Sequence, residues 1–296
     1  MCDHSGAGIR KKARMNKIHF AANADTNYVY HMLSAARCGY DNAYGERYRE
    51  HYPAEELSVF RQYEDELTVR GGEHCGRLYY LMVILPARGD IPCDQYYRAL
   101  LETRTEDIPP DFLPYEEAVR KLCRIMIRWY DDYLRQIWPA EKARLLEVIR
   151  CYQKVFDAED MTARAEAMVG ARLPAEVFTA MLVGSVSGGA EAIDISETQD
   201  VFGSDRSAED ALWFIGHEYI IYLLKEALQG EDAFTGMETW AFTEGMAEYY
   251  LKKVLGSTRF FSGQQKIARL CEAMEKEGIR GVTALYRAVR AAEIPE

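Results

Sequence analysis

Apolar residues recur at helical spacing through most of the first half of the chain. This pattern predicts a short strand over 17–20 and a series of long helices. The predicted helices span 23–37, 53–69, 75–86, 115–137 and 140–171. Gly71 and Gly72 are expected to end the second helix, and Pro139 is expected to separate the last two. Residues 1–15 lack such a pattern and are predicted to form a loose tail.

The pattern changes after Pro174. Residues 177–183 form a nearly continuous apolar run, which predicts a buried strand, and residues 192–196 alternate as a half-exposed strand does. The glycine-rich segment 184–189 between them is expected to turn. We therefore expect one α+β domain over 16–296, in which a large, mainly helical part (16–173) packs on a small mixed sheet.

A second helical pattern begins at Ser207. This serine precedes Glu209 and Asp210, and a serine followed by acidic residues is typical of a helix N-terminus. Apolar residues then recur at helical spacing up to a stop at Gly230. Because the run is apolar on nearly all sides, the helix is expected to be buried.

The candidate chemistry lies on this helix, in the order Gly216-His217-Glu218-Tyr219-Ile220-Ile221. In the HExxH motif two histidines four residues apart face the same side of a helix and bind zinc, and the glutamate activates a water molecule. Here Ile221 stands where the second histidine would be. Downstream, Glu244 begins a Glu-Gly-x-Ala sequence, which is the other half of such a site.

Residues 177–250 resemble the gluzincins, metallopeptidases of the zincin fold. The resemblance implies a helix pair in which His217 is the first zinc ligand, Glu244 is a further ligand and Glu218 is the general base. Ile221 departs from the pattern. One imidazole nitrogen and one carboxylate remain, against the three protein ligands of a catalytic zinc, so we expect zinc to be absent or substoichiometric. A lone histidine on an apolar helix is also compatible with an ordinary, hydrogen-bonded core residue.

The resemblance also implies a peptide-binding sheet edge. In zincins a strand at the edge of the sheet lies over the metal cleft, and substrate peptides pair with it. Residues 188–196 are the candidate edge, with Gly188, Gly189, Ile193 and Ile195 as substrate-binding candidates. An edge that is buried or blocked is equally compatible with the sequence. Some gluzincins stabilise the oxyanion with a tyrosine, which makes Tyr249 and Tyr250 further candidates, although packing is the simpler role for both.

Composition excludes several classes of function. The 296 residues are 48% hydrophobic, enough for a sizeable core, and carry a net charge of −11, which argues against a nucleic-acid binder. The longest apolar runs, such as 78–86, are too short to cross a membrane, and no apolar stretch follows the basic residues of the N-terminus. Seven dispersed cysteines without a CxxC pair indicate reduced thiols in a cytoplasmic protein.

Three functions remain open at this stage. The first is a degenerate metallopeptidase, a pseudo-enzyme whose cleft binds a peptide or protein segment. The second is an active zinc peptidase in which another side chain, for example His74 or His31, replaces the missing ligand. The third is a structural protein in which the former site is filled by packing. The sequence leaves the oligomeric state open.

Overall fold

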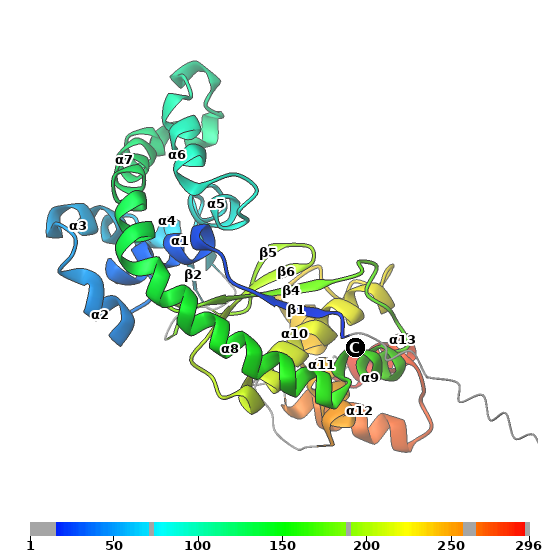
Figure 1. The fold of residues 1–296 in the computed structure, drawn as a ribbon. Helices are drawn as coiled ribbons and strands as arrows, with labels where there is room; N and C mark the ends of the chain where they lie inside the picture. The colour runs from blue at the N-terminus through cyan, green and yellow to red at the C-terminus, as the bar shows by residue number, and fades with distance from the viewer. Residues whose placement is uncertain (1–15, 71–73, 188–190, 257–264, 294–296) are drawn as a thin grey trace, which may run out of the picture.

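The computed structural model describes residues 16–70, 74–187, 191–256 and 265–293. A small mixed sheet lies at the centre of the fold (Figure 1). Its strand order is β1-β4-β6-β5, where β1 is Ile18–Ala21, β4 is Phe178–Val183, β6 is Gln199–Gly203 and β5 is Ile193–Ser196. Strands β1, β4 and β6 are parallel, and β5 pairs antiparallel with β6. The predicted strand at 192–196 is therefore an edge strand.

Helices cover both faces of this sheet, because β4 alternates its side chains between two apolar cores. Phe178, Ala180 and Leu182 enter the core formed with the helices after residue 137, whereas Met181 and Val183 enter the core formed with the N-terminal helices. A strand buried on both sides reads as a continuous apolar run, as 177–183 does. The prediction of an α+β chain with a small mixed sheet is confirmed.

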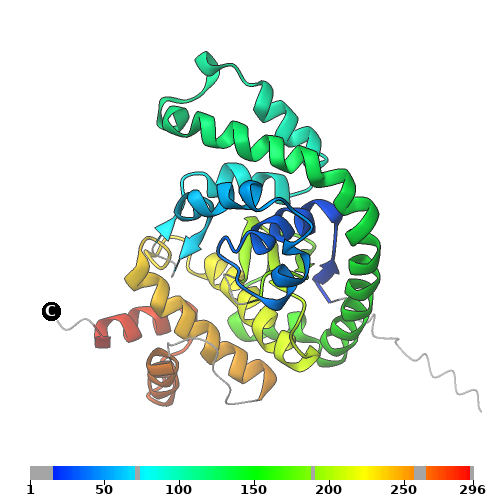
Figure 2. The same ribbon diagram turned by 90° about the vertical axis from the view of Figure 1, so that its left-hand side faces the viewer.

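The N-terminal part is mainly helical and carries a two-stranded ribbon. Its α-helices are α1 (Ala24–Ala35), α2 (Ala43–Arg49), α3 (Ala54–Gln62), α4 (Glu64–Leu67), α5 (Leu85–Ala87), α6 (Cys93–Glu102) and α7 (Glu116–Asp132). The ribbon is β2 (Val69–Arg70) with β3 (His74–Cys75), and the remaining turns are η1 (Tyr80–Ile84), η2 (Thr105–Asp107), η3 (Pro110–Tyr115) and η4 (Tyr133–Ile137). Helix α6 and the start of α7 project from the body as an arm (Figure 2).

In the described part of the chain, six helices make up the C-terminal layer. They are α8 (Trp138–Glu159), α9 (Met161–Val169), α10 (Ala208–Ala227), α11 (Met237–Leu255), α12 (Gln265–Lys276) and α13 (Val282–Glu293). Helix α10 packs against α11, α9 and α8, so it lies in the middle of this layer. The segment that carries the degenerate motif is therefore held on several sides.

Pro139 does not separate two helices, contrary to the prediction. It occupies the first turn of α8, where a backbone N–H has no helical partner to lose, and the π-helical turn η4 connects α7 directly to α8. The interruption comes instead at Asp160, whose φ of 46° is left-handed and separates α8 from α9. The predicted helix 140–171 is thus two helices.

The predicted helices 53–69 and 75–86 are also wrong in part. Tyr63, with φ −113° and ψ 23°, interrupts the first and divides it into α3 and α4. Val69 then pairs with Cys75 in the small ribbon, so residue 75 begins in a strand rather than a helix. The tail 1–15 and the proposed stop at Gly71 and Gly72 lie outside the described residues.

Candidate functional site

Helix α10 begins as the sequence predicts. Ser207 is the N-cap, and its hydroxyl accepts a hydrogen bond from the backbone N–H of Asp210 at 3.0 Å. From there to Ala227 most side chains are buried in the core. His217 and Glu218 are thereby fixed on a rigid, enclosed helix.

His217 meets Glu244 across the α10–α11 contact. The imidazole Nε2 lies 2.9 Å from Glu244 Oε2, and only 3% of His217 is exposed. The expected proximity of these two residues is confirmed. A hydrogen bond of this kind satisfies a buried imidazole that would otherwise cost about 1–3 kcal/mol.

Glu248 is a further partner that the sequence reasoning missed. Its Oε1 lies 3.8 Å from His217 Nδ1, and the side chain is fully buried. Glu248 follows Glu244 by four residues and so shares its face of α11. This four-residue spacing is the signal from which the contact of Glu248 with His217 could have been predicted. The two glutamates thus lie next to different nitrogens of the same imidazole.

The described residues do not fit a catalytic zinc site. Glu248 faces Nδ1, so it cannot join Nε2 and Glu244 around one ion. Ile221, which replaces the second motif histidine, is 1% exposed and packs in the apolar core. Across the described part of the chain no group of three histidine, cysteine, aspartate or glutamate side chains is arranged to hold a metal ion. Only two protein ligands, the His217 imidazole and the Glu244 carboxylate, remain, whereas a catalytic zinc normally has three.

Neighbouring side chains are engaged elsewhere. The Tyr219 hydroxyl donates to Glu166 at 3.2 Å, and the Tyr222 hydroxyl donates to Asp200 at 2.7 Å. His31, a suggested replacement ligand, has both ring nitrogens 2.7 Å from tyrosine hydroxyls in a separate aromatic cluster. The suggestion of His31 is therefore wrong, and the side chain of His74 lies outside the described residues.

The metal content of the purified protein tests this reading of the site. We expect well under one equivalent of zinc in protein prepared without added metal, because one imidazole and one carboxylate bind zinc weakly. Elemental analysis by mass spectrometry gives the ratio directly. One equivalent that disappears in a His217→Ala variant would contradict the expectation.

The site concentrates charge in a buried place. Burial alone lowers the pKa of His217, but the hydrogen bond that its imidazole donates to Glu244 and the charges of Glu218, Glu244 and Glu248 outweigh it and raise this pKa above its ordinary value. Burial raises the pKa of Glu218 to about 7; the charge of His217 opposes this shift, and that of Glu244 adds to it. The neighbouring carboxyl groups thus favour the protonated form of the imidazole.

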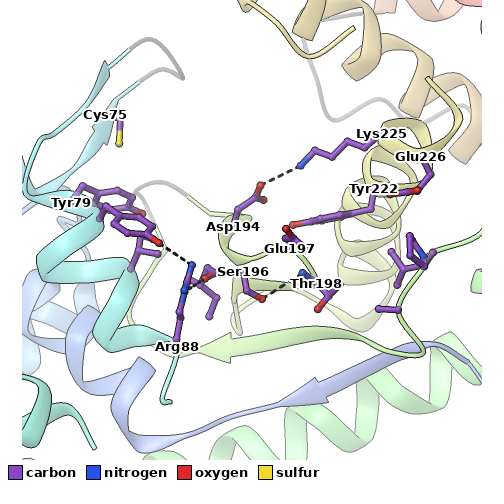
Figure 3. Close-up of a pocket in the computed structure, with 16 residues that line it drawn as sticks. Cys75, Tyr79, Arg88, Asp194, Ser196, Glu197, Thr198, Tyr222, Lys225 and Glu226 are labelled. Atoms are coloured by element: carbon purple, nitrogen blue, oxygen red, sulfur yellow. Dashed lines mark hydrogen bonds and ion pairs between the residues drawn. The ribbon is translucent and has the colours of Figure 1, made fainter. Parts of the chain in front are cut away.

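A groove of about 710 Å³ runs beside this site (Figure 3). The end of β5 and the turn after it, Asp194 to Thr198, form its floor. Tyr79, Tyr80, Ile84 and Arg88 from the N-terminal part form one wall, and Tyr222, Lys225 and Glu226 from α10 form the other. Figure 3 shows the two walls facing each other across the strand. The edge strand and the motif helix therefore border the same opening.

An ion pair and a cation–π contact hold Lys225 in place on the α10 wall. Lys225 Nζ lies 3.3 Å from Asp194 Oδ2 and 4.5 Å from the centre of the Tyr222 ring. Glu218 lies one turn before Tyr222 and two before Lys225, so these residues share a face of α10. Asp194 raises and Lys225 lowers the pKa of Glu218, after the larger effects of burial, His217 and Glu244. Glu218 is thus electrostatically coupled to the groove.

The predicted substrate-binding residues are placed unevenly. Ile195 borders the groove, but its side chain, like that of Ile193, is buried in the core formed with the N-terminal helices. Gly188 and Gly189 lie outside the described residues. Tyr249 and Tyr250 do not line the groove, and the Tyr249 hydroxyl accepts a hydrogen bond from Lys253 at 3.1 Å, in agreement with the simpler packing role. Both rings pack in the core, in edge-to-face contact.

Within the described ranges, no helix combines the length and the apolar character needed to cross a bilayer. Comparison of the chain with protein-family models, with curated proteins and with solved structures finds no match.

Proposed function

We propose that this chain is a degenerate metallopeptidase of the gluzincin type, which binds an extended peptide segment without cleaving it. The observation that carries the proposal is the groove, because the end of an antiparallel edge strand forms its floor and the helix with the HExx remnant forms one of its walls. The same juxtaposition of edge strand and motif helix is what the resemblance to gluzincins implies for a peptide cleft.

The chemistry of the groove supports a peptide as the ligand. An edge strand offers unpaired backbone N–H and C=O groups, and an added peptide strand can satisfy them. Tyr80 is 52% exposed and supplies a broad surface that is apolar with a polar tip, which suits side chains of a bound peptide. Strand addition uses backbone hydrogen bonds and does not require a metal.

The remnant site supports loss of catalysis. His217 Nε2 is already held by Glu244 at 2.9 Å, and Ile221 offers no donor atom. Glu218, with a pKa of about 7, can exchange a proton near neutral pH, yet the described residues beside it provide no complete ligand set with which to activate a water molecule. Binding is therefore the activity that the geometry supports best.

Selection from a random hexapeptide library tests the proposal. We expect immobilised wild-type protein in EDTA to enrich a defined set of peptides and to leave them uncleaved, with affinities measured afterwards by fluorescence anisotropy. Ser196→Trp places a large side chain in the groove and should weaken binding by about tenfold or more, since even one lost contact of ~1.4 kcal/mol has that effect.

Ser58→Trp is the matched control, because Ser58 is an exposed residue of α3 that does not line the groove. It should bind as the wild type does. Enrichment of no peptide, or equal binding by the Ser196→Trp variant with its fold intact by circular dichroism, would refute the proposal. Cleavage that EDTA abolishes would favour an active zinc peptidase instead.

A further inference from the structure

We propose that the groove recognises the free C-terminal carboxylate of its peptide, and that Arg88 binds this carboxylate. The inference rests on the proposed function, because it assigns a ligand class to the same groove. It is carried by three observations: the way in which the Arg88 side chain is held, the charges that line the groove, and the contact between Arg88 and the edge strand.

The guanidinium of Arg88 is fixed by two hydrogen bonds. Its Nε donates to the backbone carbonyl of Ile195 at 2.7 Å, and its Nη2 donates to the Tyr80 hydroxyl at 3.1 Å. The central carbon of the guanidinium also lies 5.6 Å from the centre of the Tyr80 ring. Figure 3 shows Arg88 at the N-terminal wall, reaching the strand. An arginine that is held in place in this way loses little entropy on binding an anion.

Arg88 keeps hydrogen-bond donors for a ligand. A guanidinium has five N–H donors, and the two contacts above use two of them. Two cationic side chains line the described groove, and they differ: Lys225 is paired with Asp194 at 3.3 Å, whereas no described carboxylate forms an ion pair with Arg88. Arg88 is thus a positioned, half-buried cation beside open volume, and a planar carboxylate is its natural partner.

The contact with Ile195 selects a chain end over an internal acidic residue. Ile195 lies at the irregular point of β5, where the register with β6 shifts between Asp194 and Ser196. Its carbonyl is already occupied by Arg88, so a peptide paired with β5 meets the guanidinium there instead of a free acceptor. A peptide that ends at this point presents its terminal carboxylate to the remaining donors. A peptide that continues would have to displace Arg88 from the strand.

The surrounding charges favour a single carboxylate over a phosphate group. Asp194, Glu197 and Glu226 also line the groove, and the chain carries a net charge of −11. A dianionic or polyanionic ligand would be repelled by this field. A peptide carboxylate carries a single negative charge, which one arginine can neutralise.

The experiment uses three random hexapeptide pools of matched composition and the full-length protein. The first pool has free C-terminal acids, the second has C-terminal amides, and the third has C-terminal amides with an internal aspartate. Mass spectrometry measures enrichment on immobilised protein. We expect the wild type to enrich free acids over both amide pools by about tenfold or more, as a charge-assisted hydrogen-bond pair provides.

Arg88→Gln should abolish the preference, and Arg98→Gln, which removes a cation from exposed α6, should retain it. If Arg88→Gln fails to fold, Tyr80→Phe removes one of the two contacts that hold the guanidinium and should reduce the preference. Equal enrichment of acids and amides by the wild type would overturn the inference and leave peptide binding intact. Equal enrichment of the internal-aspartate pool would overturn the choice of a chain end. Enrichment of no pool would refute the proposed function itself.

Discussion

Replacement of Ile221 by histidine is expected to raise zinc affinity by orders of magnitude. Position 221 follows His217 by one helical turn, so the new imidazole shares its face of α10, and Glu244 already lies 2.9 Å from His217 Nε2. A third protein ligand completes the protein's share of a catalytic zinc site. Isothermal titration calorimetry of metal-free protein gives the affinity.

The same variant should lose stability until zinc is added. Ile221 is 1% exposed in the apolar core, and a buried imidazole without a partner costs about 1–3 kcal/mol. Zinc at 100 times its dissociation constant should restore about 2.7 kcal/mol. Ile221→Gln is the control, because it introduces a polar side chain of similar length that binds zinc poorly. If Ile221→His is folded but takes up no more zinc than the control, the pocket has been repacked. That result would support a structural protein in which the former site is filled by packing.

Acid should destabilise the protein through His31. This side chain is fully buried between the hydroxyls of Tyr44 and Tyr52, and burial, with a smaller contribution from the charge of His51, lowers its pKa from 6.5 to about 3. Between these two values the unfolded chain binds a proton that the folded chain does not. Stability is therefore fully present above about pH 6.5 and falls as the pH falls towards 3. From pH 7 to pH 4.5 the loss should be about 2–3 kcal/mol.

Urea unfolding at the two pH values measures this loss. His31→Gln cannot titrate, so the free-energy difference between wild type and variant should shrink by about 2–3 kcal/mol on acidification. His19→Gln, at an exposed position of β1, should change the pH dependence little. An identical pH dependence in the wild type and His31→Gln would show that His31 is not the group responsible.

Local signals in the sequence predicted the elements that carry the motif. The cap at Ser207 located the start of α10, and the continuous apolar run located β4, because a strand buried on both faces has no alternation. These two features depend on short stretches of sequence. The contact between His217 and Glu244, which joins two helices, was implied only by the resemblance to gluzincins.

The features that the sequence did not predict depend on distant contacts. Arg88 and Tyr80 reach the groove only because the N-terminal part packs beside β5, more than a hundred residues away in sequence. Pro139 was expected to separate two helices, because the π-helical turn before it has no clear periodic signal in the sequence. The left-handed residue at the end of α8 is Asp160, whereas a glycine usually occupies such a position and signals it in the sequence.

Backbone methylation of a bound peptide tests strand addition to β5 most directly. A peptide selected by the wild-type protein would be synthesised in two forms, each with N-methyl groups on alternate residues, one set on odd and the other on even positions. Alternate N–H groups of an added strand point towards and away from the sheet, so methylation of one set blocks pairing and methylation of the other leaves it intact. In EDTA, we predict that one form loses binding by about tenfold or more, through loss of backbone hydrogen bonds to the strand, while the other binds like the parent. Equal binding by both forms would contradict strand addition to β5.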